Sequence, residues 1–255
     1  MFGPEISAEN AAELYRYYKK KRPNTRLAKV AFAGSKLFFR PNISFSDGDE
    51  ERIRSHGDRG GIFLLSANHT RARDPFVLAS AVKRRRSLES FVANTSIGAK
   101  PSLFKWGLRI LMDRVGAVPA IRGKDVAKGQ SRSGATGGFI STMVKDLNEG
   151  HNVALFGEET RNKNKKTAKE VQEFKSGTAK IRHDVSPDVD IMMVTAGLTY
   201  TEGNIVQRVL GWRKANAHFS VLPVEEPQQM PVEELSAELR SSVQHDVDAS
   251  QAMAA

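Results

Sequence analysis

The chain has 255 residues, of which 40% are hydrophobic and 27% are charged, so it suits one large α/β domain or two small ones. It contains no Cys, which excludes disulfides, cysteine-based zinc sites and a thiol nucleophile. The formal net charge of +10 indicates a polyanionic partner, for which nucleic acid, an anionic membrane and a phosphorylated substrate all qualify.

The N-terminal segment, residues 1–45, is predicted to form a pair of basic amphipathic helices. The first covers residues 8–22, with Ser7 at its start and Pro23 at its end, and the second covers residues 25–40. At the helical period the second helix separates an apolar side from a basic side; these are Leu27, Val30, Ala31, Leu37 and Phe38 against Lys29, Lys36 and Arg40. Two interpretations remain open, a helix packed on the domain and a helix lying on an anionic membrane surface. We expect the second, because each basic residue near such a surface contributes about 1 kcal/mol.

Residues 46–228 alternate between short apolar runs and longer amphipathic ones. The predicted strands are 61–66, 90–94, 116–121, 151–156, 189–200 and 217–224. The predicted helices are 74–82, 103–115 and 138–150, with a loop at 131–138. Strands separated by helices indicate an α/β fold with a mostly parallel central sheet flanked by helices.

The C-terminal segment, residues 229–255, is predicted to be an acidic helix followed by a frayed tail. After Val224 there are seven acidic residues, and Arg240 is the single Lys or Arg against them. The two ends of the chain are therefore expected to have different roles. We expect neither a signal peptide nor a membrane-spanning helix, because no basic start leads into an apolar core and no run of about 18 apolar residues occurs.

The stretch ANHTRARDPF, residues 67–76, places polar residues between two apolar runs. His69 follows a predicted strand and Asp74 starts a predicted helix, a position where active sites of open α/β sheets collect. A neutral imidazole accepts a proton from a hydroxyl near pH 7, and a carboxylate on its other nitrogen orients it. The alternative is that Asp74 caps the helix and His69 is an unrelated surface residue.

Further polar residues follow other predicted strands. They are Arg122, Glu158, Thr160 and Arg161, with Lys175 and Gly177 after them. Arg suits a bidentate grip on phosphate, so residues of this kind converging on His69 and Asp74 favour a phosphorylated acceptor that carries a hydroxyl.

Four segments in order, NHTRARDP, AKPSLFKWGLRILMDRVGAVPAIRG, FGEETRN and FKSG, resemble the glycerolipid acyltransferase family typified by 1-acyl-sn-glycerol-3-phosphate acyltransferases. The resemblance extends over roughly residues 60–200. It implies that His69 is the general base that deprotonates an acceptor hydroxyl and that Asp74 orients it. It also implies that the hydroxyl attacks the thioester of acyl-CoA or acyl carrier protein, without a cofactor or a metal.

The same resemblance implies further substrate-binding residues and a location. Arg122, Glu158, Thr160 and Arg161 match the acceptor-binding positions of the family, and Lys105 closes its Lys-x-x-Leu-Phe-Lys segment. A lysophospholipid acceptor implies a peripheral enzyme on the cytoplasmic face of the cell membrane.

Four positions depart from the family pattern. Arg71 replaces Ser, Gly157 replaces Pro, Glu159 replaces Gly, and VTAG at 194–197 lacks the usual Pro. Lysophosphatidate is the expected acceptor, and glycerol 3-phosphate, another lysophospholipid and a lyso-aminolipid stay open as alternatives. We expect Arg71 to bind the acceptor phosphate or the CoA.

The rival interpretation is a noncatalytic basic protein that binds membranes or nucleic acid. The basic runs KRRR at 83–86 and RNKNKK at 161–166 carry no interleaved aromatic residues for base stacking. We therefore interpret them as solvated or membrane-facing edges and expect no nucleic-acid partner.

Overall fold

The computed structural model describes residues 3–22, 24–92, 94–105, 108–121, 132–158, 170–201, 214–224 and 226–253. The α-helices are α1 (Ala11–Lys20), α2 (Thr25–Phe38), α3 (Asp49–Asp58), α4 (Asp74–Arg84), α5 (Leu108–Arg114), α6 (Arg132–Asn148), α7 (Gly177–Asp184) and α9 (Val232–Ala252). Two 3₁₀ helices are η1 (Arg86–Val92) and η2 (Pro101–Phe104). The strands are β1 (Asn42–Phe45), β2 (Ile62–Ala67), β3 (Thr95–Ala99), β4 (Ala117–Pro119), β5 (Asn152–Phe156), β6 (Ile191–Tyr200) and β7 (Ala215–Val221).

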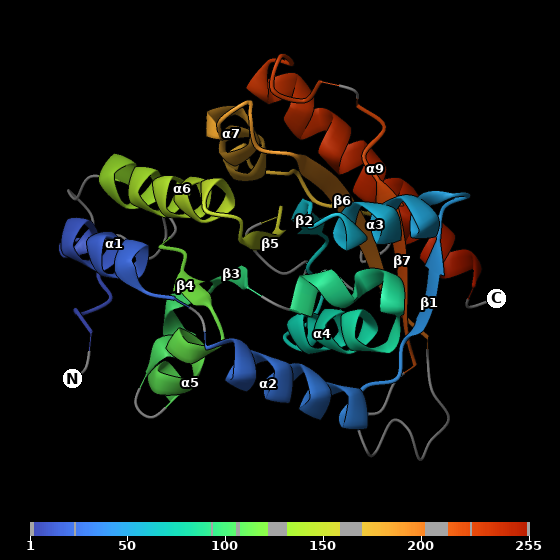
Figure 1. Cartoon of the computed structure of the whole chain (residues 1–255), viewed down its shortest axis with the longest axis horizontal. Coiled ribbons are helices and arrows are strands. Elements are labelled where there is room, and N and C mark those ends of the chain that lie inside the picture. Colours follow the sequence, from blue (N-terminus) through green and yellow to red (C-terminus); the bar gives the residue numbers. More distant parts are fainter. Residues whose placement is uncertain are drawn as a thin grey trace.

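The strands form one seven-stranded sheet in the order β1-β7-β6-β2-β5-β3-β4. Strands β6, β2, β5, β3 and β4 are parallel, whereas β7 runs antiparallel to β6 and carries β1 parallel to itself. The prediction of a mostly parallel sheet flanked by helices is confirmed (Figure 1). The carboxyl ends of the five parallel strands meet at one edge of the sheet, where β2 leads into α4.

Each face of the sheet has its own hydrophobic core, because successive side chains of a strand point to opposite faces. In β2, Leu64 packs with α1, α6, α7 and α9, whereas Phe63 and Leu65 pack with α2, α3 and α4. Both faces of β2 are buried, as is typical of a parallel sheet with helical cover. The molecule is thus a three-layer α/β/α sandwich, with helices on both sides of the sheet (Figure 1).

The two N-terminal helices lie on opposite faces of the sheet. Helix α1 packs on α6 and buries Leu14, Tyr15 and Tyr18. The hydroxyl of Tyr15 donates to the carbonyl of Pro119, and that of Tyr18 donates to Asp113 of α5 at 2.6 Å. Helix α2 packs on α4 instead.

Two local predictions are wrong. Residues 90–94 do not begin a strand, because η1 extends to Val92 and β3 starts at Thr95; so short an apolar run does not distinguish strand from helix. The Gly-rich stretch 131–138 is not a loop as predicted, because α6 begins at Arg132. Gly138 lets α1 approach, since a Cβ there would stand 2.3 Å from Tyr15 Cδ2. Close packing between the helices therefore overrides the low helix propensity of Gly.

Among the described α-helices and strands, three further ones are absent from the sequence prediction, namely β1, α3 and α7. Strand β1 has four residues at the sheet edge, and α7 has eight residues, so both are short for a periodicity argument. Helix α3 did offer a signal, because Asp49, Glu50 and Glu51 fill its first turn. No helix within the described ranges combines the length and the apolar character that a membrane crossing requires.

Candidate active site

The loop after β2 carries His69 to the carboxyl edge of the sheet. Asn68, which is buried, anchors this loop to the neighbouring strand β6. Its Nδ2 donates to the carbonyl of Leu198 at 3.0 Å, and its Oδ1 accepts from the Leu198 N–H at 2.7 Å. The backbone pairing between β2 and β6 ends at Ala67. The two side-chain bonds of Asn68 continue the connection to β6 and hold the residue before His69 in place.

Asp74 is the first residue of α4 and is fully buried. Its Oδ2 accepts from His69 Nδ1 at 3.0 Å and from the N–H groups of Thr70 and Arg71, each at 2.7 Å. Its Oδ1 accepts from the hydroxyl of Tyr200, at the end of β6. The structure therefore brings His69 and Asp74 together, and the alternative of a helix cap beside an unrelated His does not describe this carboxylate.

These contacts determine what the imidazole of His69 can do. Because a carboxylate oxygen only accepts, Nδ1 carries the proton, and the lone pair lies on Nε2. The ring stacks on Phe156 with 4.4 Å between centroids, and the His69 side chain is 19% exposed. A partly exposed imidazole with a buried carboxylate on its other nitrogen is suited to taking a proton from a hydroxyl.

Glu158 lies beneath this pair and is buried. Its carboxylate accepts from the backbone N–H groups of His69 and Gln172. Burial raises the pKa of Glu158 to about 7, and the nearby Asp74 adds to the rise. Next to it, Gly157 allows Phe174 to pack closely, because a Cβ at residue 157 would stand 2.3 Å from Phe174 Cε2. The sequence placed Glu158 among acceptor-binding residues, and the structure places it against the backbone of His69.

Two guanidinium groups border the pair. Those of Arg71 and Arg73 each lie 4.7 Å from the ring centroid of Tyr200. Burial raises the pKa of Tyr200 well above its ordinary value, so its hydroxyl stays a donor to Asp74. The sequence analysis did not single out Tyr200, Arg73 or Phe156. The one signal it offered was that Phe156 and Tyr200 end predicted strands.

Of the remaining predicted substrate-binding residues, the structure describes Lys105 alone. Arg122, Thr160 and Arg161 lie outside the described residues. Lys105 is exposed at the end of η2, and none of the described contacts joins it to His69 or Asp74.

A histidine–carboxylate pair at the carboxyl edge of a mostly parallel sheet lies where open α/β sheets collect their active sites. The sequence model of the family described as Acyltransferase matches residues 48–198, more than half of the chain. The chain belongs to this family and is an acyltransferase. A search of curated proteins finds no match.

The fold is also that of a known acyltransferase structure. The crystal structure of the 1-acyl-sn-glycerophosphate (LPA) acyltransferase PlsC from Thermotoga maritima superimposes with a TM-score of 0.54 and 16% sequence identity. The alignment covers 96% of this chain and 82% of the Thermotoga chain. At this identity the likeness shows the shared fold.

Proposed function

We propose that this acyltransferase moves a fatty acyl group from a thioester donor to the hydroxyl of a lysophosphatidate-type acceptor, giving phosphatidate. The observation that carries the proposal is the contact between His69 Nδ1 and Asp74 Oδ2, which leaves Nε2 as the base. The acceptor hydroxyl gives its proton to Nε2 while its oxygen bonds to the thioester carbonyl carbon. The carbon–sulfur bond then breaks, and His69 returns the proton to the leaving thiolate.

The donor is acyl-CoA or acyl carrier protein, and a small apolar cavity supports an apolar donor group beside His69. The cavity lies between α2, α4 and the sheet; its lining includes Phe32, Leu65, Leu78 and Phe156. Because Phe156 also stacks on His69, the cavity begins beside the base. At about 40 Å³ the cavity is too small for a whole acyl chain, so it supports only the placement of apolar donor atoms near Nε2.

Arg71 supports a phosphorylated acceptor. Its backbone N–H is held by Asp74, and its guanidinium lies over Tyr200, so a positive charge is fixed beside the base. Arg73 adds a second charge at the same ring. In Arg71→Ala, the KM for the phosphorylated acceptor rises about tenfold while the donor KM stays constant. An unchanged acceptor KM would show that the phosphate binds elsewhere.

The outward face of α2 supports docking on an anionic membrane surface. Val30, Leu37 and Phe38 are 65%, 76% and 68% exposed, and Lys29 and Lys36 lie exposed beside them. Apolar side chains flanked by cations are typical of an interfacial helix. We place this face at the cytoplasmic surface of the cell membrane.

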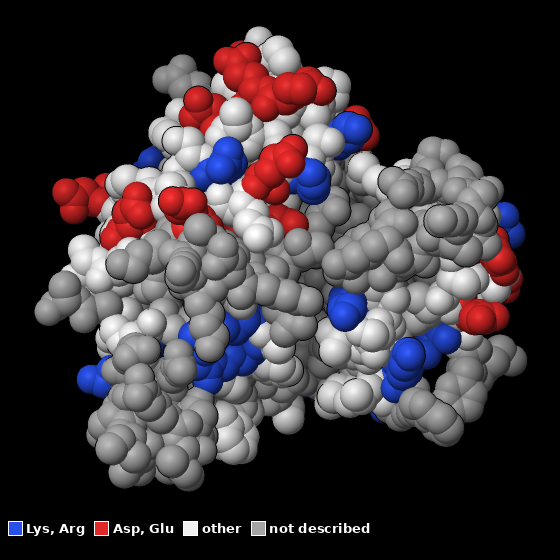
Figure 2. Space-filling view, turned by 180° about the vertical axis from the view of Figure 1, so that it is seen from behind, with Lys and Arg blue, Asp and Glu red and all other residues white. Residues whose placement is uncertain are grey.

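The charge distribution supports the same orientation. Acidic side chains gather over the upper part of the reverse face, where the C-terminal helix α9 lies, and basic ones in the lower part (Figure 2). The acidic end then points away from an anionic bilayer. In Leu37→Ser/Phe38→Ser, binding to vesicles of mixed anionic and zwitterionic lipid weakens at least tenfold. Equal binding of the wild type and this variant would reject α2 as the docking surface.

The acceptor assay tests the proposal directly. Acyl-CoA and acyl carrier protein donors are offered with lysophosphatidate, glycerol 3-phosphate, other lysophospholipids and a lyso-aminolipid, and released thiol is measured. Lysophosphatidate is the expected best acceptor, and His69→Ala is expected to lower kcat about 10²–10⁴-fold. His183→Ala, at an exposed position on α7, is the matched control.

Each other outcome has a definite meaning. Preference for another acceptor would reassign the substrate and leave the base in place. Turnover that survives His69→Ala would reject the mechanism. A wild type without turnover on any donor and acceptor would favour a protein that only binds membranes.

A further inference from the structure

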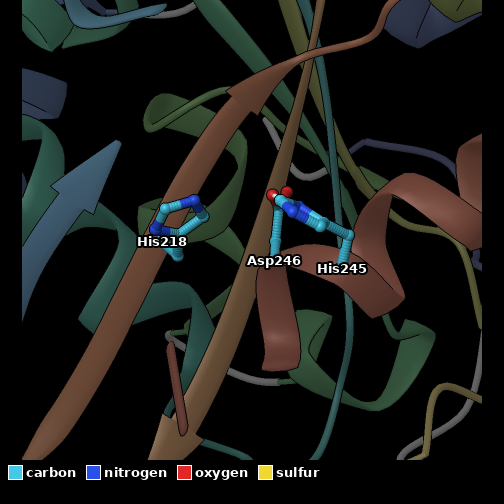
Figure 3. A group of neighbouring side chains, drawn as sticks. All are labelled: His218, His245 and Asp246. Atoms are coloured by element: carbon cyan, nitrogen blue, oxygen red, sulfur yellow. Dashed lines mark ion pairs between the residues drawn. The ribbon is translucent and has the colours of Figure 1, made fainter. Parts of the chain in front are cut away.

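Three side chains with metal-ligand chemistry meet between β7 and α9, on the face of the sheet opposite α4 (Figure 3). His218 comes from β7, and the consecutive residues His245 and Asp246 come from α9. One ligand atom from each lies within 4.8 Å of the other two. None of the three belongs to the acyl-transfer site.

Backbone packing brings these residues together. Gly197 of β6 is the register partner of His218, so both point to the α9 face. A Cβ on Gly197 would stand 2.1 Å from the carbonyl carbon of Asp246. The backbone of α9 therefore lies directly on the sheet beside His218, and the position of Asp246 does not depend on a flexible side chain.

Asp246 has an oxygen that lacks a partner. Its side chain is fully buried, and Oδ1 accepts from the Ser220 hydroxyl at 2.6 Å. Its Oδ2 has no hydrogen-bond partner among the described residues. A buried carboxylate oxygen without a partner is costly, and a bound cation would remove that cost.

Both ring nitrogens of His218 have a serine hydroxyl within hydrogen-bond distance. Its Nδ1 lies 2.7 Å from Ser44 Oγ, and its Nε2 lies 3.1 Å from Ser46 Oγ. A hydroxyl that accepts from one ring nitrogen fixes the tautomer and leaves a lone pair on the other. That nitrogen exchanges its serine contact for the ion.

We propose that His218, His245 and Asp246 bind a divalent transition-metal ion of the Zn²⁺ class, which clamps α9 to β7. Two imidazoles and a carboxylate suit Zn²⁺, with water as the fourth ligand, better than they suit Mg²⁺ or Ca²⁺, which prefer all-oxygen sites. Tetrahedral ligands at such an ion lie roughly 3.4 Å apart, so the cluster must contract. His245 supplies this movement, because its side chain is 68% exposed.

The test uses the full chain, without a histidine tag, after removal of metals with a chelator. Zn²⁺ and Mg²⁺ are each titrated by calorimetry, and Tm is measured with each. At about a hundred times its Kd, Zn²⁺ is expected to raise Tm by about 5–10 °C, and Mg²⁺ to leave it unchanged. His245→Ala is expected to weaken Zn²⁺ binding at least tenfold and to remove most of the Tm rise.

A matched control is available on α7. His183 and Asp184 are also a consecutive exposed pair, with 3.5 Å between Nδ1 and Oδ1. His183→Ala is expected to respond to Zn²⁺ as the wild type does. The proposal is overturned by a full Zn²⁺ response in His245→Ala, by no response in the wild type, or by a response that only His69→Ala removes.

Discussion

Replacing Asp74 with Asn removes the negative charge of the side chain and keeps its shape. The Asn carbonyl can accept the three N–H groups that Oδ2 accepts now, from His69, Thr70 and Arg71. Its amide can donate to the Tyr200 oxygen, which now donates to Oδ1. The fold and the ring position are then kept, and only the negative charge beside the imidazole is lost.

The expected loss of kcat follows from the distance between the imidazolium and the carboxylate. With Nδ1 and Oδ2 at 3.0 Å, the charge centres of an imidazolium and Asp74 lie roughly 4 Å apart, an attraction of about 4 kcal/mol at an effective dielectric constant of 20. Since 1.36 kcal/mol is a factor of ten, kcat falls about 10³-fold. The KM values stay nearly constant, because the imidazolium forms only during the reaction.

The assay is thiol release under saturating acceptor, with Tm as the check on folding. Tyr200→Phe is the control, because it removes one hydrogen bond to Asp74 and keeps the charge; its kcat is expected to fall about tenfold. A folded Asp74→Asn variant within fivefold of the wild-type kcat would refute an electrostatic role for this carboxylate.

Two further predictions concern stability. Because burial raises the pKa of Glu158 from 4.5 to about 7, the folded state holds its proton more tightly than the unfolded state. Glu158 therefore lowers stability as pH rises from about 4.5 through 7, by on the order of 3 kcal/mol, and Glu158→Gln removes this loss. Urea unfolding at pH 5 and pH 8 measures it, and identical pH dependence in both proteins would contradict the assignment. Gly197→Ala is expected to cost about 3 kcal/mol, because its methyl group meets the backbone of Asp246 at 2.1 Å. Gly137→Ala, in the helix α6 with nothing within 4 Å, should be neutral or slightly stabilising, and urea unfolding measures both glycine variants. A Gly197→Ala variant as stable as Gly137→Ala would contradict the close approach of α9.

The contact between His69 and Asp74 could be predicted from the sequence because both residues lie at the junction of one strand and the following helix. A separation of five residues places His69 and Asp74 within reach once the chain turns. Tyr200 could not be predicted in the same way, because it reaches Asp74 from a strand that lies 126 residues further along the chain. Sequence patterns predict contacts between residues that are close in the chain, whereas the contact between Tyr200 and Asp74 depends on the order of strands in the sheet.

Burial was the second property that sequence did not predict. Glu158 matches a substrate-binding position by its motif, and in the structure its carboxylate accepts from the backbone N–H of His69. Likewise the Gly-rich start of α6 has the composition of a loop, and helix packing against Tyr15 decides its structure. Composition thus suggested the chemistry of these segments and left open whether they face solvent or the interior.

The packing of α2 on α4 sets how far the reaction lies from the proposed bilayer surface. Phe39, just after α2, stacks on Phe76, two residues after Asp74, with 6.1 Å between centroids. Packed helices have axes about 8–10 Å apart, so the base lies about one helix diameter behind the docking face. Under the proposed docking, a lysophospholipid reaches His69 by a small rise out of its leaflet, without passing through water. The rate of such an enzyme follows the mole fraction of acceptor in the surface, and dilution with inert lipid slows it at constant bulk concentration.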